Sequence, residues 1–258
     1  MSLFAHSRGR GSDLVLLHGW GMNAAVWEGL PSQLTVDRRL WQIELPGHGG
    51  SPFLLRHDGL DAWADACLES APERAVWLGW SLGGLIALEA ALRAPERIHA
   101  LVLVAATPRF VRAPDWPAAM DADVLAQFHD ELLADPAGTL DRFLALQVMG
   151  SEAARDSLRT LRREVAQRPA PSPAALEIGL DLLRDSDLRE RIGVLTCPTL
   201  WLFGRRDILV PAATSEGVAR LLPGSRQCVI VRAAHAPFLS HPQETGEAVS
   251  GFLRDVSC

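Results

Sequence analysis

The chain of 258 residues contains no lysine and no tyrosine, and its single asparagine is Asn23. Without a lysine amine there is no Schiff-base chemistry, no anchor for pyridoxal phosphate and no P-loop, because each needs that amine at a fixed place. Asn23 is followed by Ala-Ala, so the chain also has no N-glycosylation sequon. These absences exclude several large enzyme classes before any motif is considered.

Basic residues are also fewer than acidic ones. The 25 basic residues, all arginines, face 31 acidic ones, which gives a formal net charge of −6. A nucleic-acid binder normally has a basic balance that neutralises phosphates, so we expect no nucleic-acid partner. No apolar run approaches the roughly 18 to 20 residues that span a bilayer, and the first residues lack the apolar core of a signal peptide. We therefore expect no membrane association.

The cysteines are few and scattered. None lies in a C-x-x-C pair or at metal-ligand spacing from a histidine, which indicates incidental thiols in a reducing compartment and no metal site. They are Cys67, Cys197, Cys228 and Cys258. The sequence thus predicts a cytoplasmic protein that uses no metal.

Composition and patterning predict one α/β domain over residues 1–258. With 48% hydrophobic residues the chain can bury a large core. Apolar runs typical of buried strands alternate with helical spacing at 59–71 and 82–94, and this order predicts parallel strands joined by right-handed crossovers. The runs are Leu14–Gly19, Leu40–Gly47, Ala75–Trp80 and Ala100–Ala106.

After Ala106 the strand signal disappears for about ninety residues. Four helical patterns occupy this stretch, at 121–134, 139–149, 151–166 and 172–188. Strand patterns resume at 199–204 and 227–233, before a last helix at about 244–253. We predict a mostly parallel central sheet with helices on both faces and a helical lid inserted at about residues 112–192.

The strongest chemical signal is the sequence G-W-S-L-G at residues 79–83. It lies where an apolar strand ends and a helix begins, and a serine on so sharp a turn needs small neighbours such as Gly79 and Gly83. The turn exposes the Ser81 hydroxyl at the end of the sheet and leaves the Leu82 N–H at a helix N-terminus. The alternative, a glycine-rich helix start without a catalytic role, is disfavoured by this strand-turn-helix setting.

A serine nucleophile needs a base and an orienting carboxylate, expected in the chain order Ser, acid, His. Asp207 follows the strand pattern at 199–204, and His235 follows the one at 227–233. Each residue alone also fits an ordinary loop position, with Asp207 paired to its neighbouring arginines. His241 competes as the base but precedes a proline and more naturally starts the last helix. Together the three positions predict a catalytic triad of Ser81, Asp207 and His235.

The oxyanion hole needs a second N–H donor from the loop after an early strand, which the motif H-G-W-G at residues 18–21 provides. We assign the backbone N–H of Trp20 to this role, beside that of Leu82. We expect His18 and His48 to brace their loops by hydrogen bonds rather than transfer protons.

These motifs resemble the α/β-hydrolase superfamily, through LLHGWG, LPGHGGS, GWSLGG, GRRD and AAHAPF between residues 16 and 238. More narrowly, LLHGWGMNAAVW, WLGWSLGG, RFLALQVMG and AAHAPFLSHP resemble the pimeloyl-[acyl-carrier protein] methyl ester esterases of biotin synthesis. Members of that family hydrolyse a methyl ester at the far end of a pimeloyl chain held on acyl carrier protein. The resemblance covers nearly the whole chain, including the expected lid.

The resemblance implies roles for individual residues. Ser81 is the nucleophile, His235 the general base and then acid, and Asp207 the orienting carboxylate. No cofactor is implied. The substrate pocket implied by the resemblance is lined by Trp20, Leu82, Phe143, Gln147 and His235.

An acidic carrier protein would need a basic docking face. Helical spacing places four arginines on one stripe of the helix expected at 151–166, namely Arg155, Arg159, Arg162 and Arg163. With Arg142 from the preceding helix, we expect Arg155 and Arg159 to bind the carrier. Gly138 stands where the family pattern suggests another arginine. The alternative is a solvated face on which the arginines pair with local carboxylates.

Two other functions share most of these features. A broader carboxylesterase for short acyl esters would have the same triad and differ in the lid and pocket. A catalytically silent binding protein on the same fold is disfavoured by the intact triad. We expect the protein to be a monomer.

Overall fold

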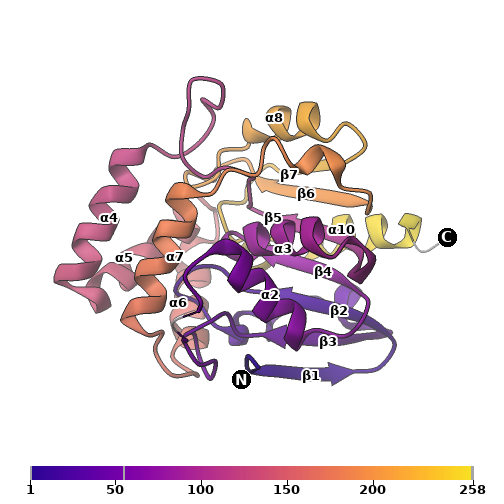
Figure 1. The fold of residues 1–258 in the computed structure, drawn as a ribbon, viewed down its shortest axis with the longest axis horizontal. Helices are drawn as coiled ribbons and strands as arrows, with labels where there is room; N and C mark the ends of the chain where they lie inside the picture. Colours follow the sequence, from indigo (N-terminus) through magenta and orange to yellow (C-terminus); the bar gives the residue numbers. More distant parts are fainter. Residues whose placement is uncertain (1, 55, 257–258) are drawn as a thin grey trace.

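The computed structural model describes residues 2–54 and 56–256, and Cys258 lies outside them. A seven-stranded sheet with the order β1-β3-β2-β4-β5-β6-β7 forms the centre of the molecule (Figure 1). Its strands are β1 (Ala5–Gly9), β2 (Ser12–Leu17), β3 (Arg38–Ile43), β4 (Ala75–Trp80), β5 (Ile98–Val104), β6 (Thr199–Gly204) and β7 (Arg226–Ile230). Among the described strands of this sheet, the pairing of β1 with β3 is antiparallel and the other pairings are parallel, so the predicted mostly parallel α/β sheet is confirmed.

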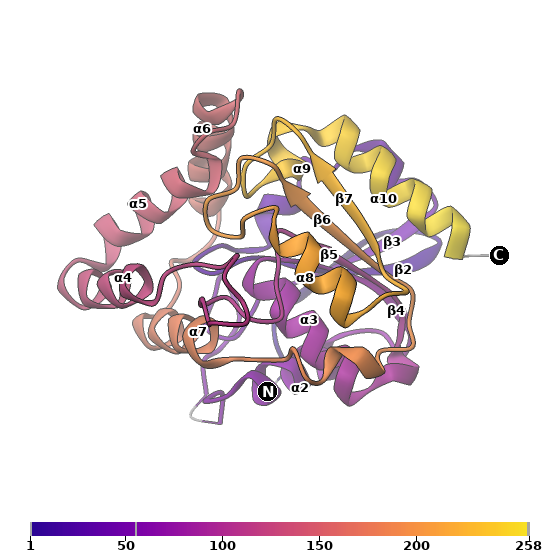
Figure 2. The ribbon, with the colours of Figure 1, turned by 90° about the horizontal axis from the view of Figure 1, so that it is seen from above.

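Helices cover both faces of the sheet, as predicted (Figures 1 and 2). One face carries α2 (Leu60–Ser70), α3 (Leu82–Arg93) and α8 (Thr214–Leu221). The other carries α1 (Ser32–Thr35) and α10 (Pro242–Val256), which contact each other. Strand β1 and helix α8 were not predicted, because both are short and largely polar.

Four helices between β5 and β6 stand at the carboxyl ends of the parallel strands (Figure 1). We call α4 (Ala122–Ala134), α5 (Pro136–Val148), α6 (Ala154–Val165) and α7 (Pro173–Asp185) the α4–α7 insertion. All four predicted helices are present. The second begins earlier than predicted because the Asp135 side chain accepts a hydrogen bond from the Gly138 N–H at 3.0 Å and caps it. Among the described residues, no helix has the length and apolar character that crossing a membrane requires.

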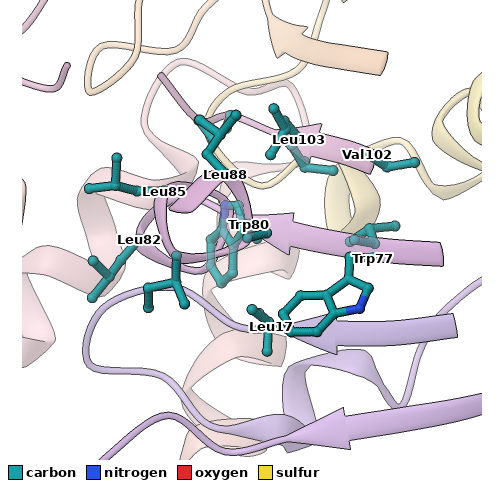
Figure 3. Close-up of a cluster of buried hydrophobic side chains, with 14 of the residues drawn as sticks. Leu17, Trp77, Trp80, Leu82, Leu85, Leu88, Val102 and Leu103 are labelled. Atoms are coloured by element: carbon teal, nitrogen blue, oxygen red, sulfur yellow. The ribbon is translucent and has the colours of Figure 1, made fainter. Parts of the chain in front are cut away.

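Every residue of β4, a strand in the middle of the sheet, is buried. Figure 3 shows buried side chains from four neighbouring elements, among them Trp77 and Trp80 of this strand, leucines of α3, Leu17 of β2 and Leu103 of β5. Each buried side chain of this size contributes about 1.5–3 kcal/mol. The junction between β4 and α3, where Ser81 lies, therefore has buried apolar side chains on both of its elements.

Candidate active site

Ser81 occupies a strained turn between β4 and α3. Its φ of 55° and ψ of −119° lie where glycine is favoured over other residues. A Cβ at Gly79 would overlap the Gly83 carbonyl, and one at Gly83 would overlap the Leu17 carbonyl. The close approach of these backbones explains the small residues on either side of Ser81. The Ser81 N–H donates to the Val104 carbonyl at 3.0 Å and ties the turn to the neighbouring strand.

Asp207 and His235 meet at the ends of β6 and β7. Nδ1 of His235 lies 2.7 Å from Oδ2 of Asp207, and both side chains are buried. The other carboxylate oxygen accepts hydrogen bonds from the backbone N–H groups of Leu209 and Val210, at 2.8 and 3.0 Å. One oxygen of the Asp207 carboxylate is therefore held by the backbone, and the other orients the imidazole of His235.

The remaining nitrogen of His235 is unpartnered. Nε2 is buried and makes no hydrogen bond within residues 2–54 and 56–256. Because Nδ1 faces a carboxylate, it carries the proton in the neutral imidazole, which leaves Nε2 as an acceptor. The His235 carbonyl accepts a bond from the Trp80 indole N–H at 2.8 Å, so the residue preceding Ser81 also anchors the histidine.

The loop after β2 lies directly against the serine. A Cβ at Gly19 would stand 3.4 Å from the Cβ of Ser81. Trp20, the next residue after Gly19, carries one backbone N–H, and Leu82, the first residue of α3 and the residue after Ser81, carries another. Neither N–H donates to an acceptor within the described part of the chain. Two free N–H groups next to a serine, one at a helix N-terminus, can bind a developing oxyanion.

His18 and His48 brace the same loop. Nε2 of His18 accepts from the Leu45 N–H at 3.0 Å, and Nε2 of His48 accepts from the Gly21 N–H at 3.2 Å. Each Nδ1 faces a backbone carbonyl. Burial lowers the pKa of His18 to about 3 and that of His48 to about 4, so both stay neutral. Their contacts are those of bracing residues, as the sequence predicted.

The α4–α7 insertion packs onto the Trp20 side chain. The Trp20 indole N–H donates to the Leu176 carbonyl of α7 at 2.8 Å, and its ring meets Phe143 edge to face at 4.7 Å. Gly179, also on α7, lies so close that a Cβ there would come 2.7 Å from Trp20 Cδ1. Gln147 is buried and donates to the Phe143 carbonyl at 3.3 Å. Sequence reasoning missed Leu176 and Gly179, although a glycine inside a helical pattern was a possible signal.

Comparison with known proteins places the chain in a family. The family described as "alpha/beta hydrolase fold" matches residues 14–242. Pimeloyl-[acyl-carrier protein] methyl ester esterase of Aeromonas salmonicida is 46% identical over 98% of this chain and 100% of its own length. The protein of that name from Xanthomonas axonopodis pv. citri is 45% identical, over 96% and 97%. The chain belongs to this methyl ester esterase family.

Solved structures agree on the fold of this family member. An esterase from Exiguobacterium antarcticum has a TM-score of 0.87 at 23% identity and covers 99% of this chain and 96% of its own. A bromoperoxidase from Bacillus anthracis also has a TM-score of 0.87, at 21% identity over 97% and 95%. At such identities the likeness shows the α/β-hydrolase fold alone.

A groove on the esterase's insertion lies between α4 and α5. Its volume is about 350 Å³, and it is lined by Val124, Gln127, Phe128, Glu131, Arg142, Ala145, Leu146 and Met149. The Phe128 ring, one of these lining residues, meets Phe143 edge to face at 5.8 Å, and Phe143 in turn contacts Trp20. A chain of aromatic rings thus connects the groove with the loop beside Ser81.

The predicted carrier-binding arginines differ in their partners. Arg142 pairs with Glu131 at 3.0 Å and Arg159 with Asp156 at 3.0 Å. The other two members of the predicted stripe are also paired, Arg162 with Asp141 and Arg163 with Glu164. Arg155 is exposed and forms no ion pair within the described residues. The pairing of these arginines with nearby carboxylates, which the sequence left open as an alternative, is therefore present. Acidic groups of a carrier would have to displace those carboxylates or bind the same arginines beside them.

No group of three or more potential metal ligands occurs among the described residues. Cys67, Cys197 and Cys228 are free thiols. Burial raises the pKa of the Cys67 thiol, which makes it a poor nucleophile.

Proposed function

We propose that this chain is a serine carboxylesterase that hydrolyses the methyl ester of pimeloyl-[acyl-carrier protein], giving pimeloyl-[acyl-carrier protein] and methanol in biotin synthesis. The observation that supports it best is the buried Asp207–His235 pair, whose side chains lie 2.7 Å apart. The Nε2 atom of His235 makes no hydrogen bond within the described residues, and His235 follows a strand of the same sheet whose strand β4 leads to the strained Ser81. The full-length similarity to esterases of this name supports the choice of substrate.

The mechanism is a two-step acyl transfer. His235 Nε2 accepts the Ser81 proton as Oγ adds to the ester carbonyl, and the N–H groups of Trp20 and Leu82 bind the oxyanion. The tetrahedral intermediate collapses, and its methoxide leaves as methanol with the proton from His235. Water then adds to the acyl-enzyme and gives its proton to His235. The second collapse releases the pimeloyl carboxylate and returns a proton to Ser81.

Asp207 supports each step through its charge and position. It holds the imidazole in the tautomer that leaves Nε2 unprotonated, and it stabilises the imidazolium that forms when Nε2 takes the proton. Its two backbone hydrogen bonds keep it from rotating away. These residues complete the reaction without a metal or organic cofactor.

The α4–α7 insertion acts in this proposal as a lid over the acyl chain. Phe143 packs against Trp20, and the buried Gln147 donates to the Phe143 carbonyl. In this proposal both would contact a chain whose ester lies at Ser81. The ester is distal to the thioester, so the carrier itself stays outside. Arg142, Arg155 and Arg159 are the lid residues proposed to contact it.

The test measures methanol release from methyl pimeloyl-[acyl-carrier protein] and from a free short-chain ester, with the wild type and Ser81→Ala. We expect rapid release from the carrier substrate and a loss of about 10⁴-fold or more in the variant. Release from the free ester alone would establish the broader carboxylesterase instead. Failure of a fluorophosphonate probe to label Ser81 would favour the silent binding protein.

We also propose a monomer that works in the cytoplasm, where free thiols such as Cys67 persist. Size-exclusion chromatography with light scattering tests the first point, with about 28 kDa expected.

A further inference from the structure

Three segments meet where the insertion touches the catalytic loops. They are the turn between α5 and α6, the loop after β6 that leads to Asp207, and the loop after β7 that leads to His235. Arg206 donates to the Gly150 carbonyl at 3.1 Å and to Glu152 at 3.3 Å, and Arg232 donates to Glu152 at 3.4 Å. Figure 2 shows the loops after β6 and β7 reaching toward α5 and α6.

This junction carries a surplus of positive charge. Arg232 also pairs with Glu244 at 3.6 Å, so Glu152 and Glu244 are the acidic members of the cluster. Three arginines lie on the loops after β6 and β7, Arg205, Arg206 and Arg232, and a fourth, Arg155, is the second residue of α6. Four positive charges stand against three negative ones, those of Glu152, Glu244 and the buried Asp207, which leaves a surplus of one on a chain whose net charge is −6. Arg155 and Arg205 are exposed and form no ion pair within residues 2–54 and 56–256.

The same segments also expose large apolar side chains. Met149 and Ile208 are each 49% exposed, and Val231 is 63% exposed. Each stands within two residues of a cluster residue: Met149 precedes Gly150, Ile208 follows Arg206, and Val231 precedes Arg232. Methionine and arginine are both enriched at protein–protein interfaces relative to the rest of a protein surface.

We propose that these residues form a docking surface for the body of the acidic carrier protein that holds the acyl chain. We call it the junction surface: Met149, Glu152, Arg155, Arg205, Arg206, Ile208, Val231 and Arg232. The inference rests on the proposed function and extends it, because docking then involves the catalytic loops of the core as well as the insertion. The carrier would bridge the two parts beside the residues that position Asp207 and His235.

Charge complementarity selects an acidic partner for this surface. Glu152 is shared by two arginines, so neither guanidinium is saturated by its present contacts. Carboxylates of a docked carrier can use the remaining donors without breaking the internal pairs. Arg205 and Arg155 have their whole guanidinium groups available, and the apolar side chains exclude water between the charged contacts.

Photo-crosslinking tests the placement of the carrier. The photoreactive residue p-benzoylphenylalanine is placed at Val231 in the Ser81→Ala variant, which keeps the ester intact, and the purified carrier substrate is added. The matched control is Val36, which is 61% exposed and precedes β3 at the opposite end of the sheet. We expect crosslinking at 231, reduced by excess unlabelled carrier, and little at 36. Equal crosslinking at both positions, or none at 231, overturns the proposal.

Charge reversal tests the contribution of the arginines. We expect Arg205→Glu to lower the ratio of kcat/KM for the carrier substrate to that for a free methyl ester about three- to tenfold, with a smaller effect at high salt. Arg10→Glu, an exposed arginine between β1 and β2, should leave the ratio unchanged. An unchanged ratio in Arg205→Glu would contradict the inference.

Methanol release by the unmodified enzyme keeps the two proposals apart. Release without crosslinking at 231 overturns the junction surface alone. Crosslinking at 231 without release supports the surface and overturns the proposed function. Absence of both overturns both.

Discussion

Gly179 offers a way to disturb the oxyanion hole without touching any reacting group. A methyl group at this position would lie 2.7 Å from Cδ1 and 3.1 Å from Nε1 of Trp20, and 3.5 Å from a methyl of Leu82. The Trp20 ring cannot yield freely, because it is held by the Leu176 carbonyl and packed against Phe143. In Gly179→Ala the indole must therefore shift, and the Trp20 N–H beside Ser81 shifts with it.

The expected loss is larger in rate than in stability. Overpacking a core costs about 1–3 kcal/mol, and replacing glycine by alanine inside a helix returns about 1 kcal/mol, so the net destabilisation is about 0–2 kcal/mol. Complete loss of one oxyanion donor costs about 10²- to 10³-fold in kcat, so a displaced donor should cost about 10- to 100-fold. The assay is steady-state hydrolysis of a free methyl ester, with thermal unfolding in parallel.

The matched control is Gly251→Ala in α10. A Cβ there would meet its nearest atom, on Arg254, at 3.8 Å, which is ordinary contact. We expect unchanged kcat and a stability gain of up to about 1 kcal/mol. A kcat for Gly179→Ala within twofold of the wild type would refute the coupling between α7 and the oxyanion hole.

Two further predictions concern Asp207 and the bracing histidines. Asp207→Asn should lower kcat by about 10⁴-fold with little change in melting temperature, because the amide oxygen still accepts from Leu209 and Val210 while its NH₂ favours the wrong imidazole tautomer; a loss below tenfold would contradict the assigned role. The pKa of His48, lowered to about 4 by burial, predicts an acid-sensitive fold. Below about pH 6.5 the unfolded chain binds a proton at His48 that the folded chain does not, so the free energy of unfolding falls as pH falls. Between pH 5.5 and 4.5, urea unfolding should show His48→Gln losing about 1.2 kcal/mol less than the wild type, and equal losses would place the acid sensitivity elsewhere.

The sequence predicted those parts of the molecule that depend on local patterns. The apolar run of β4, the glycines around Ser81 and the helical spacing of α3 each determine their structure over a few residues. Asp207 and His235 were predicted because an apolar strand pattern precedes each of them, and parallel strands bring their carboxyl ends to one edge. In the structure their side chains lie 2.7 Å apart.

The features that sequence reasoning missed depend on distant contacts. Strand β1 is a polar edge strand, and it is specified by its pairing with β3 more than by its own residues. The contact from Trp20 to Leu176 joins positions 156 residues apart, and no local pattern encodes it. Likewise, the pairing of Arg162 with Asp141 depends on how α5 and α6 pack. Local spacing showed that the arginines share a stripe, but not which carboxylates face them.

The backbone conformation of Ser81 sets catalysis against stability. A side chain at a φ of 55° costs about 1 kcal/mol or more relative to glycine, which adopts such angles freely. A chain selected only to fold would place glycine at this turn and be more stable for it. Random mutation followed by selection for heat resistance alone should therefore favour loss of the reactive hydroxyl, and the serine persists only where hydrolysis itself is under selection.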